Sequence, residues 1–190
     1  MEFVNKNEVD ALLGEMGYEE ILDDSDHPHI AMKHMDGGVY LHLGSVEGDC
    51  EPLDGAKNVP IEQDGLAGFV DRMIHRLNLS DLLLLPTGKW RNVFDAVAFS
   101  LATNESWQEF DASATVELNT RDPLLCGPAD FPLLVDLVGA LMSDADQPNQ
   151  GLTMMATSVP VIAEVNPQGA VRLSIGNQAL ADEIMEAVAV

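Results

Sequence analysis

Two groups of residues have the types and spacing to bind a ligand, and the first is a basic loop. The segment Thr87-Gly88-Lys89-Trp90-Arg91 follows four leucines, Leu82–Leu85, and precedes a helical apolar pattern. A junction between a strand and a helix presents backbone N–H groups, and the two cations beside them favour an anion. We therefore predict a small-anion site at Gly88, Lys89 and Arg91. The spacing differs from a phosphate loop, which needs an earlier glycine and a Ser or Thr after the lysine.

The second group consists of histidines that a predicted hairpin would bring together. Asp36-Gly37 is a typical two-residue hairpin turn, and the flanking segments 29–35 and 39–43 read as its strands. With this pairing, His29 and His42 are near diagonal neighbours on one face. That face would be turned toward solvent or a partner, while the other, apolar face packs inward.

These two histidines, with Asp26 from the acidic loop before them, could hold a metal ion. The pattern predicts a metal site at Asp26, His29 and His42, in a metal-binding protein or a metal-dependent hydrolase. The alternative is that no metal binds. The sequence has neither HExxH nor CxxC spacing, and Pro28 and His29 stand where a calcium loop needs a ligand and a glycine.

The cysteines Cys50 and Cys126 lie far apart in the sequence and give neither a disulfide framework nor paired metal ligands. Cys126 precedes a predicted helix, whose positive end would lower the pKa of its thiol and activate it. The alternative is a small buried thiol. Reduced thiols, and a first segment without a basic and then apolar leader pattern, predict a cytoplasmic protein.

Charge is the most extreme property of the whole sequence. The chain has 32 acidic and nine basic residues among 190, for a formal net charge of −23. Such a surface repels nucleic-acid phosphates and anionic lipid, so we predict neither partner. It favours a basic protein, and we predict a protein partner or self-association. The alternatives are a general adaptation to salt, and pairing of Lys89 and Arg91 with the protein's own carboxylates.

Apolar periodicity predicts the elements that must position these residues. Helical spacing predicts helices over 7–16, 62–77, 90–101 and 130–142, and a last helix capped by Asn177. Alternation and apolar runs predict strands over 29–35, 39–43, 82–85, 114–120, 152–157, 160–165 and 170–175.

The last two of these strands have a predicted register. If Ala163 pairs with Leu173, the apolar side chains meet on one face and Glu164 lies opposite Arg172 on the other. That agreement between the two faces favours this register over its neighbours.

The predicted fold class is α+β, with a mixed, largely antiparallel sheet of about seven short strands and about five helices packed on it. We predict a single compact domain over 1–190, with two lobes, 1–104 and 105–190, as the alternative. A chain of this length can bury a sizeable core. Arg121-Asp122 is a charged loop pair for which buried pairing and catalysis both remain open.

The sequence shows neither a serine nucleophile motif nor a dinucleotide glycine fingerprint. We therefore predict a non-enzymatic module for protein interaction or small-ligand binding, with no cofactor. The metal site is the alternative, and whether the protein is an enzyme stays open.

Overall fold

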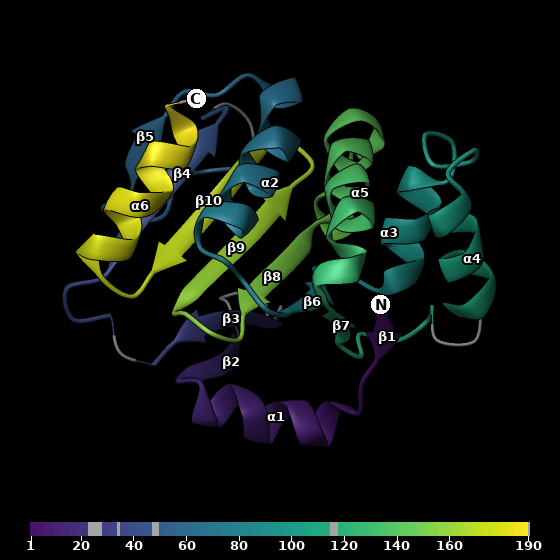
Figure 1. The fold of residues 1–190 in the computed structure, drawn as a ribbon, viewed down its shortest axis with the longest axis horizontal. Helices are drawn as coiled ribbons and strands as arrows, with labels where there is room; N and C mark the ends of the chain where they lie inside the picture. The colour runs from purple at the N-terminus through teal and green to yellow at the C-terminus, as the bar shows by residue number, and fades with distance from the viewer. Residues whose placement is uncertain (23–27, 34, 47–49, 115–117, 190) are drawn as a thin grey trace.

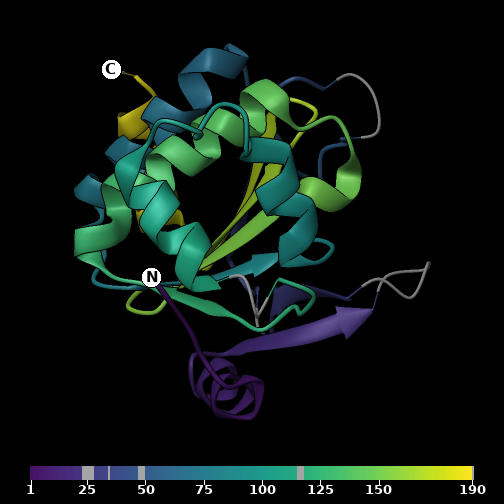
Figure 2. The ribbon, with the colours of Figure 1, turned by 90° about the vertical axis from the view of Figure 1, so that its right-hand side faces the viewer.

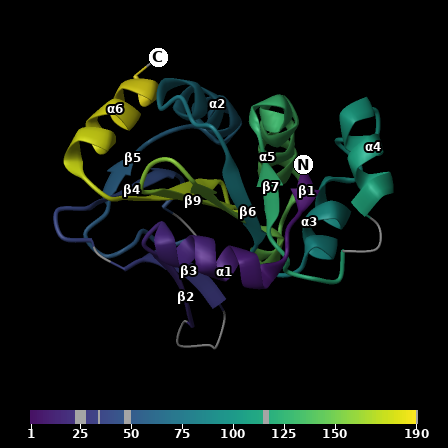
Figure 3. The same ribbon diagram turned by 60° about the horizontal axis from the view of Figure 1, so that its bottom comes forward.

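The chain forms three layers around one large sheet. A computed structural model describes residues 1–22, 28–33, 35–46, 50–114 and 118–189. Several helices cover one face of the sheet, and a helix with a small second sheet lies below the other face (Figures 1 and 3). A view turned by 90° shows the same layering edge-on (Figure 2). The fold is α+β, as predicted.

The large sheet has eight strands in the described residues, in the order β1-β7-β6-β8-β9-β10-β4-β5. Its neighbouring strands are antiparallel except β4 and β5, so the sheet is mixed and largely antiparallel, as predicted. The strands are β1 (Glu2–Phe3), β4 (Val39–Gly44), β5 (Lys57–Val59), β6 (Leu82–Pro86), β7 (Leu124–Cys126), β8 (Leu152–Ala156), β9 (Val161–Asn166) and β10 (Ala170–Ile175).

The helical layer contains the main hydrophobic core. In it α2 packs against α5 and α6, and α3 lies beside α5 with α4 beyond it (Figure 1). Each helix buries the apolar stripe that its spacing of three and four residues creates. Its helices are α2 (Leu66–Arg76), α3 (Trp90–Val97), α4 (Glu105–Ala114), α5 (Phe131–Asp144) and α6 (Gln178–Val188), with short 3₁₀ turns at Gln63–Gly65, Pro128–Asp130 and Pro148–Gln150.

The opposite face of the sheet is covered by the N-terminal segment. There α1 (Lys6–Glu15) leads into a two-stranded sheet of β2 (Tyr18–Leu22) and β3 (Pro28–Met32). A second, smaller core forms between these layers, in which Val9, Leu13, Tyr18 and Ile30 pack on Leu83, Leu85, Met155 and Ile162 of the large sheet. This face of the sheet is therefore apolar under α1 and β2.

One buried phenol joins the two layers. The Tyr18 hydroxyl donates toward the carbonyl oxygens of Ala156 and Val159, each 3.0 Å away. The same oxygen accepts a hydrogen bond from Val161 N at 3.2 Å. Burial raises the pKa of this phenol to about 12, although the hydrogen bond from Val161 opposes the shift. The small sheet is thus tied to the connection between β8 and β9.

The register predicted for the last two strands is confirmed. Ala163 pairs with Leu173, and Glu164 pairs with Arg172. The alternation works because Ala163 and Leu173 are buried under the helices while the charged pair lies on the other face. The predicted cap of the last helix is also confirmed, since Asn177 Oδ1 accepts from Leu180 N at 3.0 Å.

The predicted hairpin over 29–43 is wrong. Asp36 and Gly37 do form a turn, but the segments on either side of it belong to different sheets. β3 pairs backward with β2, whereas β4 pairs with β10 and β5. The turn signal is local, and both flanking strands find apolar partners elsewhere: Ile30 in the smaller core and Leu41 and Leu43 in the main one.

The strand predicted over 114–120 is also wrong where the structure describes it. Ala114 is the last residue of α4, and Leu118 lies in a turn. Both side chains are buried. Two apolar residues four positions apart fit a helical repeat as well as a strand repeat. The apolar pattern therefore identified the buried positions but not the type of secondary structure.

Strands from both predicted lobes are combined in the same sheet. β6 lies between β7 and β8, and β4 lies beside β10, so elements from 1–104 and 105–190 share neighbours. No helix in the described part of the chain has the length and apolar character that a membrane span requires.

Candidate functional site

A polar pocket of about 620 Å³ lies on the face of the large sheet opposite the main helical layer. It begins where the apolar contact with α1 and β2 ends, so the small sheet forms one of its walls. Its charged lining residues are Glu20, His29, Arg121, Glu164 and Arg172, and its uncharged polar ones are Thr87, Asn149, Thr153, Asn166 and Gln168.

The floor of the pocket is a row of polar side chains on neighbouring strands. The register places Thr153 of β8 beside Glu164 of β9, and Glu164 beside Arg172 of β10. Arg172 Nε lies 2.9 Å from Glu164 Oε2, and these side chains are 26% and 19% exposed. Arg172 Nη1 also donates to Glu51 O at 3.3 Å. Because the pair is mostly buried, it is screened less than a surface pair.

One wall carries a second pair of opposite charges. In β2, alternation places Glu20 on the same side as Tyr18, which is the side that faces the large sheet. Burial lowers the pKa of Arg121, and the nearby Glu20 carboxylate opposes that shift. Arg121 also supports the loop after β6, since its Nε donates to Gly88 O at 3.0 Å and its Nη2 to Pro86 O at 3.3 Å.

The rest of the lining is aliphatic. Ile30 and Leu85 extend the smaller core to the edge of the pocket, and Leu53 comes from the connection after β4. Pro86 and Pro148 complete this side. Among the described lining residues there is no phenyl, phenol or indole ring, and the imidazole of His29 is the one aromatic ring. The pocket therefore combines the ion pair of Glu164 and Arg172, the opposite charges of Glu20 and Arg121, and an aliphatic surface.

The predicted anion loop contributes to this pocket through Gly88 alone. Lys89 and Arg91 are exposed and do not line it. The backbone donors on which the prediction depended are bonded within the protein: Gly88 N to Asn149 O, Trp90 N to Thr120 O and Arg91 N to Leu118 O. Lys89 N donates to Asn92 Oδ1 at 2.9 Å. The anion site at Gly88, Lys89 and Arg91 stays a prediction, but these backbone N–H groups are already bonded within the protein.

The two predicted histidine ligands lie in different sheets. His29 is in β3 and lines the pocket, whereas His42 is in β4 of the large sheet. His42 is completely buried rather than turned to solvent, with Nε2 2.5 Å from Ser45 O. Asp26 lies outside the described residues. Within the described part of the chain, no group of three or more His, Cys, Asp or Glu side chains is placed to hold a metal ion. The metal site at Asp26, His29 and His42 stays a prediction. The hairpin that was expected to bring the two histidines together is not formed.

Both cysteines are buried thiols. Burial raises the pKa of Cys126 to about 12, and the Asp130 carboxylate adds to the shift. The predicted alternative of a small buried thiol is thereby confirmed for Cys126. Burial also raises the pKa of Cys50, whose thiol lies close enough to Arg172 and Glu164 to feel their charges. Neither thiol is set up as a nucleophile.

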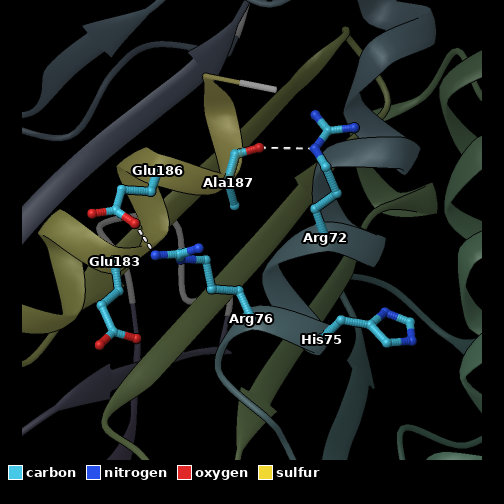
Figure 4. A pocket seen from close by; sticks show the side chains of 6 residues that line it. All are labelled: Arg72, His75, Arg76, Glu183, Glu186 and Ala187. Carbon is cyan, nitrogen blue, oxygen red and sulfur yellow. Dashed lines mark hydrogen bonds and ion pairs between the residues drawn. The ribbon is translucent and has the colours of Figure 1, made fainter.

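A second, shallower groove of about 490 Å³ runs between α2 and α6 (Figure 4). Its two arginines already have partners within the protein. Arg72 Nε donates to the carbonyl oxygen of Ala187 at 2.8 Å, and Arg76 Nη2 forms an ion pair with Glu186. The pairs cross from one helix to the other in the figure. Because both arginines are already bonded within the protein, this groove is the weaker candidate site.

Comparison with protein-family models, with curated proteins and with solved structures finds no match to this chain.

The decisive pocket residues had only a partial signal in the sequence. The pair of Glu164 and Arg172 was predicted from strand register, but as a surface pair rather than as the floor of a site. Glu20 and Arg121 meet because β2 crosses over the sheet next to the loop that precedes β7. Nothing in the local pattern around either residue indicates that encounter.

Proposed function

We propose that this protein is a non-enzymatic module that binds a small polar molecule in the pocket between β2–β3 and the large sheet. The observation that carries the proposal is the pocket itself, whose charged and hydrogen-bonding groups converge beside an aliphatic surface. Its volume of about 620 Å³ falls within the range of about 300–1,000 Å³ typical of ligand sites.

The lining supports binding rather than turnover. Catalysis by a nucleophile needs a hydroxyl or thiol within reach of a base. The hydroxyls of the described lining are those of Thr87 and Thr153, and neither is hydrogen-bonded to a histidine or carboxylate of the described chain. A protein partner or self-association remains a separate prediction, which the pocket does not address.

A ligand screen with a matched pair of variants tests the proposal. Purified protein is heated with a panel of amino acids, short peptides, sugars, polyamines, dicarboxylates and nucleotides, and hits are measured by calorimetry. A ligand at 100 times its Kd adds about 2.7 kcal/mol to the free energy of unfolding, which raises the melting temperature by several degrees.

The pocket variant is Glu164→Gln with Arg172→Gln, which removes both charges of the floor and leaves no unpaired ion. The control is Arg76→Gln with Glu186→Gln, which removes the ion pair of the α2–α6 groove in the same way. We expect the pocket variant to weaken binding at least about tenfold, since charge-assisted hydrogen bonds contribute about 1.5–3 kcal/mol. Binding that ignores the pocket variant, or a panel without any hit, would refute the proposal.

A further inference from the structure

We propose that the ligand of this pocket is a zwitterion, namely a short peptide with free amino and carboxyl ends and an aliphatic side chain. The inference rests on the proposed function and adds the chemical class of the ligand. Three features of the pocket lead to it: the balance of its charges, the surroundings of Arg121 and Glu164, and the nature of its uncharged surface.

The first feature is charge balance. The described lining contains the carboxylates of Glu20 and Glu164 and the guanidinium groups of Arg121 and Arg172. These charges cancel, so a ligand of zero net charge keeps the pocket neutral. The molecule as a whole carries a net charge of −23 and repels anions such as phosphates and dicarboxylates. A cation is attracted at long range, yet it would leave both arginines without a new partner.

The second feature is the state of Arg121, which suits a ligand carboxylate. Burial of this guanidinium outweighs the effect of Glu20, because the pKa of Arg121 is lowered despite that carboxylate. A ligand carboxylate placed beside this guanidinium would stabilise its charged form. Its Nε and Nη2 atoms are held by the carbonyl groups of Gly88 and Pro86, so the guanidinium is fixed in position before a ligand arrives.

Glu164 suits the ammonium end of the ligand. Its Oε2 atom pairs with Arg172 Nε, and no described residue bonds to its Oε1 atom. A carboxylate has about four acceptor sites, so Glu164 can hold its arginine and an ammonium group together. Its side chain is 19% exposed, which places the new ion pair in a partly desolvated setting.

The uncharged lining residues indicate which groups the ligand carries between its two charged ends. Ile30, Leu53 and Leu85 offer an aliphatic patch next to the charged floor. The amide groups of Asn149, Asn166 and Gln168 can both donate to and accept from peptide groups. The imidazole of His29 is the one aromatic ring of the described lining, which therefore offers a nucleobase less stacking surface than several aromatic side chains would.

The test compares four probes by calorimetry with the full chain: leucylglycine, glycylleucine, and the N-acetylated and C-amidated forms of whichever binds more tightly. Blocking either end should weaken binding at least about tenfold, because each end loses a charge-assisted contact. The blocked peptides keep the size and the side chain of the parent, so the loss reports charge alone.

Pocket variants then assign the two ends. Glu164→Gln should weaken binding of the free peptide but leave the N-acetylated peptide unchanged, and Arg121→Gln should do the same for the C-amidated peptide. Glu183→Gln in the α2–α6 groove is the matched control and should change neither. If Arg121→Gln does not fold, the two blocked peptides on the unaltered protein still decide the question.

The failures of the two proposals can be told apart. If sugars, polyamines or nucleotides bind in the pocket and free peptides do not, the pocket is a ligand site and the zwitterion is wrong. A requirement for one free end alone would also overturn the zwitterion and would point to the chain end of a protein. If no compound of either panel binds, both proposals fail.

Discussion

Single side chains hold the layers of this protein together, and Tyr18 shows how. It stands in a short strand outside the large sheet, yet its hydroxyl contacts three backbone groups around the connection of β8 and β9. The same strand positions Glu20 two residues later, next to Arg121. The anchoring of one phenol and the geometry of the pocket wall are therefore linked through two residues of backbone.

Replacing this phenol tests the link. Tyr18→Phe removes the hydroxyl and leaves buried carbonyl and N–H groups without it, which should lower the free energy of unfolding by about 1–3 kcal/mol. Urea denaturation followed by circular dichroism measures the change. Tyr40→Phe is the control, because the Tyr40 hydroxyl has no hydrogen bond to a described residue. Equal losses in both variants would contradict the anchoring role.

Alkaline pH should weaken the folded protein through the same phenol. Burial raises the pKa of Tyr18 from its ordinary value of 10.0 to about 12. The unfolded chain then loses this proton at a lower pH than the folded one, so the contribution to stability is complete below about pH 10 and is lost as the pH rises toward 12. Tyr18→Phe should show a smaller fall in the urea midpoint between pH 9 and 11.5 than the parent. Parallel curves would argue against a buried, protonated phenol.

At the scale of elements, close backbone approach decides how β4 ends. Gly44 has φ of 107°, and a Cβ atom there would lie 2.3 Å from the carbonyl oxygen of Gly169. The glycine therefore lets the end of β4 lie against the turn between β9 and β10, beside the strands that carry the pocket floor. Gly55 also has a positive φ, 77°, but no atom lies within 4 Å of the position that a Cβ atom would take there.

These two glycines make a matched test. Gly55→Ala should cost about 1–2 kcal/mol of stability, because an L-residue is strained at positive φ. Gly44→Ala should cost roughly 1–3 kcal/mol more, since the backbone must also move. Thermal unfolding of both variants gives the difference. If Gly44→Ala is no less stable than Gly55→Ala, β4 does not approach the turn as described.

Strand pairings with both faces specified could be predicted from the sequence, whereas a pairing inferred from a turn alone could not. The register of β9 and β10 was fixed by apolar residues on one face and by Glu164 and Arg172 on the other. The segment after Asp36-Gly37 had a strong turn signal, but a turn does not determine which strands pair across it. The pocket depends on contacts between segments distant in the sequence, such as Glu20 with Arg121, and such encounters leave no local pattern.

At the scale of the whole molecule, the C-terminal strands join two groups that otherwise do not touch within the large sheet. β1, β7 and β6 form one side, β4 and β5 form the other, and β8, β9 and β10 lie between them. Each group of strands therefore depends on the same three for a neighbour. The single domain over 1–190 and its alternative of two lobes, 1–104 and 105–190, both stay predictions.

Unfolding should then be a single cooperative transition. Trp90 and Trp107 both lie in the aromatic cluster beside α5, so tryptophan fluorescence reports that side of the molecule. Far-ultraviolet circular dichroism reports all of it. We expect the two signals to give the same urea midpoint, as two-state unfolding requires. Separate midpoints would favour lobes over 1–104 and 105–190.

The order of the strands also has a consequence for how the chain is made. A ribosome delivers β4, β5, β6 and β7 well before residue 152, where the first of the three central strands begins. Until then, the inner edges of both strand groups are unpaired, and such edges are prone to join other chains. The nascent protein must therefore wait for residues 152–175, which form β8, β9 and β10, before it can close its sheet. During that interval, the large net negative charge of the protein repels other incomplete chains and opposes their association.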